Sequence, residues 1–233
     1  MLSKTALKAI EFYGGKDVWQ NAKTIEAEVS TTGLAFTLKR SPVFNHAKIV
    51  MEVDKPFVKL TPIGRDKNIT GILDGNVVRL EDENGNVIAE RKNARNLFPY
   101  GRRLFYWDDI DMTYFANYAF WNYFTFPNLL MNSTIKWNEK EEGFLEAIFP
   151  ESIPTHSKFQ EFKIDMSTGK LLQHNYTVDV FGSWANVANV VSEHTEENGL
   201  SFPSKRIVTP ILRNKVLKSP VMIAIQVHNY SVK

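Results

Sequence analysis

Apolar and polar residues alternate along most of this chain, which is the pattern of half-buried β-strands. Clear examples are Ile25, Ala27 and Val29, then Leu34, Phe36 and Leu38, and then Ala47, Ile49, Met51 and Val53. Asp74-Gly75 and Asn84-Gly85 interrupt the alternation as hairpin signals, because both central positions of a type I′ turn need positive φ. We therefore predict an antiparallel β-meander over residues 24–92 and a second one over residues 134–232.

Two segments depart from this alternation and are predicted to be helices. The first covers residues 3–14, with Ser3 as a plausible N-cap and Gly14-Gly15 as the stop signal. The second covers residues 109–131, where Pro127 is expected to end or kink the helix. Asp108 and Asp109 fit its N-terminus, since carboxylates are favoured at the positive end of the helix dipole.

The segment from Tyr106 to Phe126 is unusually rich in aromatic residues. Each large aromatic side chain can bury ~150–250 Å², so this helix needs an extensive apolar surface to cover it. A long series of short strands curls easily around its own apolar face. The sequence thus predicts one α+β domain over residues 1–233, in which a highly curved antiparallel β-sheet, an open or half barrel, wraps around the aromatic-rich helix.

Composition and charge exclude several classes of function. The formal net charge is only +2, and basic residues are mixed with acidic ones, so a nucleic-acid partner is not expected. There is no cysteine, which excludes thiol catalysis and disulfides. The first residues lack the apolar run of a signal peptide, and no window reaches the ~18 apolar residues of a membrane span. We therefore expect a soluble, cytoplasmic protein without an integral membrane segment; its oligomeric state is left open.

Residues two apart in a strand share a face, and this parity identifies polar side chains that point inward. His174 and Tyr176 share a face with Leu172 and Val178, and Gln160 shares one with Phe162. The resulting candidate cluster consists of His156, Gln160, His174, Tyr176, His194 and Arg206.

Two interpretations of this cluster are open. The side chains could handle protons or a ligand, because histidine titrates near neutral pH and tyrosine or arginine can stabilise a developing oxyanion. Alternatively, they hydrogen-bond one another and complete a partly polar core. The candidate catalytic residues are His156, His174, Tyr176 and Arg206, and the candidate ligand-binding residues are Trp107, Tyr114, Tyr118, Trp121, Asn122, Gln160 and His194.

No motif in the chain specifies a cofactor. The histidines lack the paired spacing of a zinc site, and the glycine pairs are turn signals, so neither a metal nor another cofactor is predicted. The basic doublets Lys39-Arg40, Arg91-Lys92 and Arg102-Arg103 are interpreted as solvated edges that discourage strand pairing.

The opening of the chain, a short helix that ends at Gly14-Gly15 and leads through Trp19 into alternating strands, resembles the bacterial lipoprotein carriers of the LolA/LolB-like group. The helix between two meanders is similar to the same group. The resemblance implies an open antiparallel sheet around an apolar cavity that helices close.

A narrower resemblance is to a set of soluble bacterial proteins of unassigned function. It rests on Trp107-Asp108-Asp109, Tyr114 to Phe124, Phe149-Pro150, Thr155-His156-Ser157, Gln160, His174-Asn175-Tyr176 and Phe202 to Arg206.

These patterns favour two functions. The first is binding of a hydrophobic small molecule, of lipid, isoprenoid or polyketide type, in an apolar cavity between the sheet and the aromatic helix. The alternative is a cofactor-independent enzyme, an isomerase, cyclase or dehydratase, that uses inward His, Tyr and Arg side chains on an apolar substrate. A protein-binding scaffold would instead expose a large apolar patch.

Overall fold

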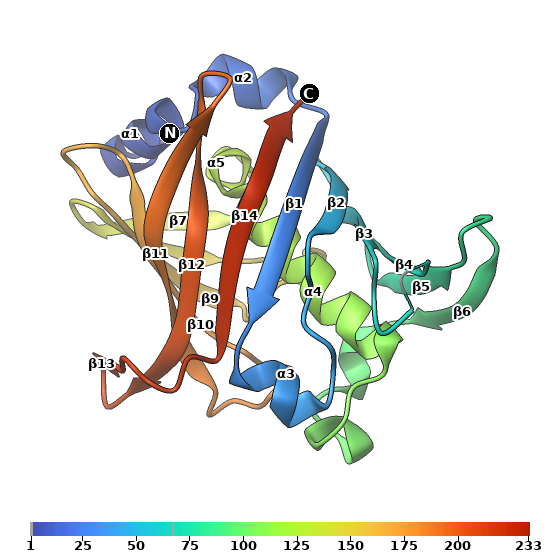
Figure 1. Cartoon of the computed structure of the whole chain (residues 1–233). Helices are drawn as coiled ribbons and strands as arrows, with labels where there is room; N and C mark the ends of the chain where they lie inside the picture. The colour runs from blue at the N-terminus through green and yellow to red at the C-terminus, as the bar shows by residue number, and fades with distance from the viewer. Residues whose placement is uncertain (1, 67) are drawn as a thin grey trace.

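The computed structural model describes residues 2–66 and 68–233, and its strands form one antiparallel sheet that curves into an open half barrel (Figure 1). The strand order is β6-β5-β4-β3-β2-β1-β14-β12-β11-β10-β9-β8-β7, with β13 paired to β12 outside this path. The predicted α+β fold with a strongly curved antiparallel sheet is confirmed.

The strands are β1 (Thr24–Thr32), β2 (Ala47–Glu52), β3 (Phe57–Thr61), β4 (Thr70–Asp74), β5 (Val77–Glu81), β6 (Val87–Lys92), β7 (Lys136–Glu141), β8 (Phe144–Ile148), β9 (Phe159–Ile164), β10 (Leu171–Thr177), β11 (Asn186–Glu197), β12 (Leu200–Leu212), β13 (Lys215–Val216) and β14 (Ile223–Val232). The helices are α1 (Lys4–Phe12), α2 (Lys16–Asn21), α3 (Leu34–Lys39), α4 (Asp109–Phe124) and α5 (Phe126–Leu129), with 3-10 turns η1 (Ala94–Leu97) and η2 (Gly101–Leu104).

The alternation in the sequence places the apolar side of the sheet on its concave face. In β1, Ile25, Ala27 and Val29 are buried while their neighbours are partly exposed. Register irregularities interrupt the β1–β14 ladder at Glu28/Val29 and the β11–β12 ladder between Val191 and His194. Such bulges increase the local twist, which helps a long sheet to curve around a central element.

That central element is α4, which runs along the concave side of the sheet (Figure 1). Every residue from Ile110 to Phe124 is buried, so this helix is packed against protein on all sides. Its approach to the sheet is close at β4, where a Cβ on Gly71 would lie 2.5 Å from Thr113 Oγ1. Asn117 Nδ2 also donates to the carbonyl oxygens of Val58 and Gly71, at 3.3 and 3.0 Å. These contacts fix the helix, and therefore the direction of its aromatic rings.

The helix predicted over residues 109–131 is divided at Thr125 into α4 and α5, with Pro127 in the first turn of α5. In the N-terminal segment, Ser3 caps α1 as predicted, through a hydrogen bond of 3.2 Å from the Ala6 amide to Ser3 Oγ. The second short helix, α2, follows directly after Gly15 and was not predicted.

The segment of Leu34, Phe36 and Leu38 was predicted to be a strand, and this prediction is wrong. It forms α3, which begins after Gly33, a residue with φ of +132°. A Cβ at Gly33 would lie 2.3 Å from the Met222 carbonyl oxygen, so only glycine lets β1 turn into α3 against this backbone. The apolar positions of so short a segment fit either period, and tertiary contact decided between them.

The N-terminus of α4 is held by an ionic cluster. Asp108 caps the helix, forming reciprocal hydrogen bonds with Asp111, as expected for an acidic residue at this position. Asp111 is fully buried and accepts from Arg91, Arg103 and Arg102 at 2.5, 2.7 and 2.9 Å. The interpretation of the doublets that contain Arg91, Arg102 and Arg103 as solvated edges is therefore wrong: these three residues bind the carboxylates of the helix N-terminus.

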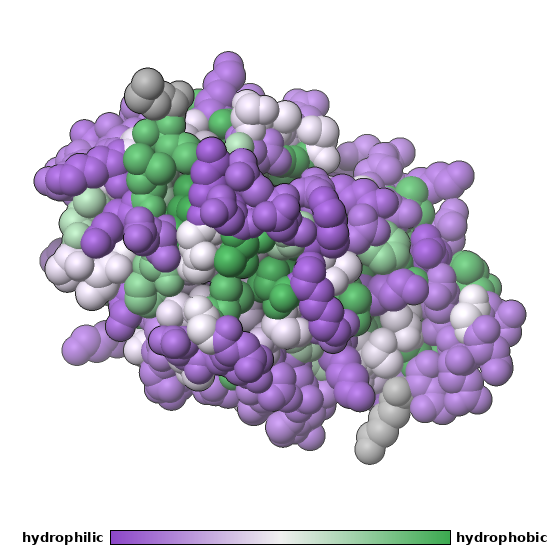
Figure 2. Space-filling model, turned by 90° about the horizontal axis from the view of Figure 1, so that it is seen from above, coloured by the Kyte–Doolittle hydropathy of each residue, from purple (hydrophilic) through white to green (hydrophobic). Residues whose placement is uncertain are grey.

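The two ends of the half barrel differ. Both chain termini, α1 and α2 lie at one end, whereas α3, β13 and the β10–β11 loop lie at the other (Figure 1). The end with the termini is seen from above in Figure 2, where hydrophilic residues cover most of the surface and hydrophobic ones show between them. The candidate site lies toward the opposite end.

Candidate functional site

An apolar pocket with a volume of about 270 Å³ opens at the end of the sheet that carries α3. Its walls come from the β10–β11 loop, β11, β12 and the connection from β12 to β14. The apolar side chains that line it are Val178, Phe181, Trp184, Val187, Val208, Ile211, Leu212, Leu217, Met222 and Ile223, together with Ala35 and Ala185. Trp184 and Leu212 are 74% and 60% exposed, so they form the rim of the pocket.

Buried residues close the inner side of this pocket. Phe115 reaches it from α4, and His156 and Tyr176 line it from the β8–β9 loop and from β10. The rings of His156 and Tyr176 stack with their centroids 3.9 Å apart. The apolar wall therefore ends at two polar side chains that are themselves buried.

Tyr123 of α4 links these two side chains. Its hydroxyl lies 2.5 Å from the Tyr176 hydroxyl and 2.8 Å from His156 Nε2. The second ring nitrogen of His156, Nδ1, is buried and has no hydrogen-bond partner among the described residues. A continuous chain of hydrogen bonds thus runs from Tyr176 through Tyr123 to the imidazole of His156.

Arg95 fixes the loop that carries His156. Its guanidinium donates to the carbonyl oxygens of Thr155 and His156 at 2.6 and 3.1 Å, and it forms an ion pair with Asp179 at 3.0 Å. Because Arg95 belongs to η1, it ties the segment before α4 to the loops at the other edge of the half barrel.

His174 and Gln160 form a second layer next to the hydrogen-bond chain of Tyr176, Tyr123 and His156. His174 Nε2 lies 2.5 Å from Gln160 Oε1, and Gln160 Nε2 donates to Thr155 Oγ1 at 2.5 Å. The His174 ring stacks on Phe162 with a centroid separation of 4.1 Å. His174 is not among the residues that line the apolar pocket.

Arg206 is only 1% exposed, which is unusual for an arginine. Its Nη2 donates to the Tyr123 carbonyl oxygen at 3.2 Å, and its guanidinium lies 5.0 Å from the centre of the Tyr123 ring. Nε and Nη1 have no hydrogen-bond partner in the part of the chain that the structure describes. The guanidinium therefore sits behind the tyrosine pair, held by an aromatic face and one carbonyl group.

Burial sets the protonation states of these groups. It lowers the pKa of His156 and of His174 well below the ordinary value, with the charge of Arg95 adding to the effect at His156. Burial also raises the pKa of Tyr176 well above its ordinary value and that of Tyr123 to about 12. At neutral pH the inner end of the pocket is thus lined by uncharged donors and acceptors.

The structure brings part of the predicted cluster together at the pocket. Of the predicted site residues, His156 and Tyr176 line it directly. Trp107 lies behind its wall, 4.9 Å from Phe181 between ring centroids, and Tyr118 lies 5.0 Å from the His156 ring. Their roles as ligand-binding residues stay predictions.

The other predicted residues contact different parts of the core. Trp121 Nε1 donates to the Glu52 carbonyl oxygen, Asn122 Nδ2 donates to Tyr118 and Pro154, and His194 Nε2 lies 2.9 Å from the Tyr13 hydroxyl. Tyr114 lines a separate cleft of about 660 Å³ near Arg95. None of these four side chains is part of the apolar pocket, and their assignment to a binding site stays a prediction.

Sequence reasoning missed most of the pocket wall. Phe181 and Trp184 belong to a loop, Leu212 is the last residue of β12, and Leu217 and Met222 belong to the connection between β12 and β14. Alternation gives no information on loops, because the side chains of a loop do not point alternately to two faces as those of a strand do. The only available signal was the number of apolar residues between Pro210 and Ile223, which is high for a connection.

Comparison with known proteins identifies the fold and no family. No family model matches the chain, and no curated protein matches it. Among solved structures, a LolA superfamily protein from Nitrosomonas europaea is similar with a TM-score of 0.51 and 11% identity, over 100% of this chain and 94% of that one. A DUF1329 family protein from Desulfovibrio piger is similar with a TM-score of 0.50 and 10% identity, over 98% and 91%.

These similarities confirm the predicted LolA-like half-barrel layout. The narrower resemblance to soluble bacterial proteins stays a prediction. Within the described part of the chain, none of the helices has the length and apolar character needed to cross a membrane.

Proposed function

We propose that this protein binds a hydrophobic small molecule, of lipid, isoprenoid or polyketide type, in the apolar pocket. The observation that carries the proposal is the composition of the pocket. Its walls are mostly apolar, its rim is exposed, and its few polar side chains are Asn186 and the buried His156 and Tyr176 at the inner end. Mostly apolar pockets with few convergent polar groups are the usual form of small-molecule sites.

The dimensions and polarity of the pocket restrict the ligand. Its volume of about 270 Å³ lies just below the ~300–1,000 Å³ of common ligand sites, which suits one acyl chain or a compact ring system. His156 and Tyr176 are uncharged there, and a carboxylate buried against neutral groups would lose most of its hydration. The ligand that fits best therefore ends in a hydroxyl or carbonyl group.

Replacing Val187 with phenylalanine is expected to weaken binding of a fluorescent long-chain alcohol by about 100-fold or more. Val187 is buried in the wall, so the larger ring occupies space that the ligand needs. Loss of contact for about four methylene groups, at ~0.8 kcal/mol each, corresponds to this factor. Binding is measured by fluorescence titration, and native mass spectrometry of protein purified from cells should show a bound ligand.

The matched control is Val50→Phe, which adds the same volume at an exposed position of β2 and should leave binding unchanged. Equal binding by the wild type and by Val187→Phe would contradict the proposal, provided that thermal unfolding shows both proteins folded.

A cofactor-independent enzyme is the second candidate, because the hydrogen-bond chain from Tyr176 through Tyr123 to His156 ends at the pocket. Such a chain could move a proton to or from a bound substrate. Replacing Tyr176 with phenylalanine interrupts it and keeps the ring. If the protein is an enzyme, turnover of a ligand identified by extraction should fall by about 100-fold while binding is retained; unchanged turnover would exclude this route.

A further inference from the structure

We propose that the pocket end of the molecule docks on an anionic lipid bilayer, so that ligand passes between the membrane and the pocket. This inference rests on the proposed function and adds a partner to it. The docking surface is defined by six exposed apolar side chains on the segments at the pocket end: Leu34, Leu38, Trp184, Leu212, Val216 and Val221. Trp184 and Leu212 also line the pocket.

Three segments far apart in the sequence form this docking surface. The backbone of α3 joins the β12–β14 connection through hydrogen bonds from Leu34 N to Val221 O and from Ala35 N to Met222 O, at 3.1 and 3.0 Å. The β10–β11 loop meets both at the pocket, whose wall includes Ala35, Trp184 and Met222. In Figure 1 these segments lie together at the end opposite the termini. The three segments therefore lie together at the pocket end of the half barrel.

An aromatic and aliphatic rim of this kind suits the boundary between lipid headgroups and acyl chains. Tryptophan is favoured at that depth, since its ring is apolar and its N–H remains near water. Trp184 is 74% exposed, whereas Trp19, Trp107 and Trp121 are buried in the core. The Trp184 indole packs against Gly182 of the same loop, where a Cβ would lie 2.6 Å from Nε1, and the rest of its apolar surface is left exposed at the mouth of the pocket.

The charges around the docking surface favour an anionic partner. No acidic residue follows Glu197, and none lies between Glu28 and Glu52. The β10–β11 loop carries Asp179, which forms an ion pair with Arg95 at 3.0 Å. The two segments without acidic residues carry basic residues at the docking surface: Arg40 next to α3, and Arg213, Lys215 and Lys218 in the β12–β14 connection, all of them exposed. Lysine and arginine near an anionic membrane are each attracted to it, and these four stand among insertable apolar side chains. An uncharged partner surface would not be attracted by these four basic residues.

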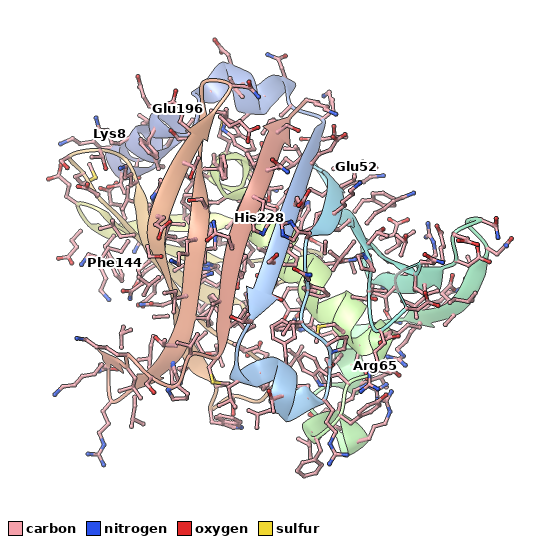
Figure 3. All side chains as sticks on the ribbon, viewed as in Figure 1. Lys8, Glu52, Arg65, Phe144, Glu196 and His228 are labelled. Atoms are coloured by element: carbon pink, nitrogen blue, oxygen red, sulfur yellow. The ribbon has the colours of Figure 1, made fainter. Side chains whose placement is uncertain are left out.

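The opposite end is different in character. Glu196 and Lys8 are labelled there in Figure 3, and the surface around the termini in Figure 2 is mostly hydrophilic. Docking through the pocket end would thus leave the mixed-charge end in water and place the pocket mouth at the lipid surface.

The test is binding to vesicles of phosphatidylcholine with and without phosphatidylglycerol, measured by co-sedimentation. The wild type should bind the anionic vesicles and lose binding as salt is raised. The variant Arg213→Glu, Lys215→Glu, Lys218→Glu should bind at least about tenfold more weakly, since three attractive charges become repulsive. The matched control, Lys8→Glu, Lys16→Glu, Lys23→Glu, changes the net charge equally at the other end and should retain binding.

Trp184 supplies a second readout. Vesicles with brominated acyl chains should quench its fluorescence in the wild type, and Trp184→Ser should abolish this quenching and weaken vesicle binding. The docking proposal would be overturned if the wild type did not bind anionic vesicles, or if both charge variants lost vesicle binding to the same extent. Self-association that depends on Trp184 without vesicle binding would also overturn it, in favour of a second copy as the partner.

The docking proposal and the ligand-binding proposal can fail separately. Titration with the fluorescent alcohol in the absence of vesicles tests the pocket alone, and the charge variant should bind this probe as the wild type does. Normal probe binding with no vesicle binding would refute docking and leave the proposed function intact.

Discussion

Replacing Asp111 with alanine is expected to reduce the free energy of unfolding by about 3–5 kcal/mol, because it removes the buried partner of three arginines and a carboxylate of the capping box of α4. The Asp111 carboxylate is fully buried and accepts from three arginines, Arg91, Arg102 and Arg103. It also closes the capping box with Asp108 at the start of α4. Chemical denaturation monitored by circular dichroism measures the change.

The matched control is Glu193→Gln, which breaks an exposed ion pair with Lys205. Exposed pairs of this kind contribute ~0–1 kcal/mol, so this variant should be nearly as stable as the wild type. If Asp111→Ala reduced the free energy of unfolding by less than about 1 kcal/mol, the arginines would be solvated or paired elsewhere in the variant. The ionic cluster would then not be what holds α4 in place.

Acidification from about pH 7 to about pH 5 is expected to reduce the free energy of unfolding by about 4 kcal/mol through His156 and His174 alone. Burial lowers the pKa of both side chains well below their ordinary value. In the unfolded chain each returns to a pKa of ~6.5, so the unfolded state binds more protons as the pH falls. The contribution of each histidine to the free energy of unfolding is therefore present above about pH 6.5 and is lost below it. Between about pH 7 and about pH 5 this loss is about 2 kcal/mol per histidine.

Denaturation curves at several pH values test this dependence, and the slope is the informative quantity. His174→Gln should remove about a third of the slope that the buried histidines produce, because burial also lowers the pKa of His194, to about 4. Leu172→Ala changes an exposed side chain of the same strand and no titratable group, so it serves as the control and should leave the slope unchanged. A wild-type stability that is flat between these pH values would show that the two imidazoles are accessible to protons in the folded protein.

The sequence by itself determined the sheet and the aromatic core helix. Alternation identified the concave face, since residues two apart in a strand must share a side, as Ile25, Ala27 and Val29 do. The aromatic residues around α4 could be buried only by a sheet that curves over them. Asp108 was identified at the helix N-terminus from the local chemistry of helix dipoles and caps. All of these rest on interactions within a few residues or on one repeating period.

The tertiary structure decided what surrounds the pocket. Leu34 to Leu38 alternates like a strand, yet close contact with the Met222 backbone makes it a helix. Arg91, Arg102 and Arg103 look like solvated residues until α4 brings Asp111 between them. The inward parity of Tyr176 was predictable, but its meeting with Tyr123 and His156 depended on three separate elements. Periodicity is a property of one segment, whereas a pocket is made by segments distant in sequence, and their packing is fixed only when the whole chain folds.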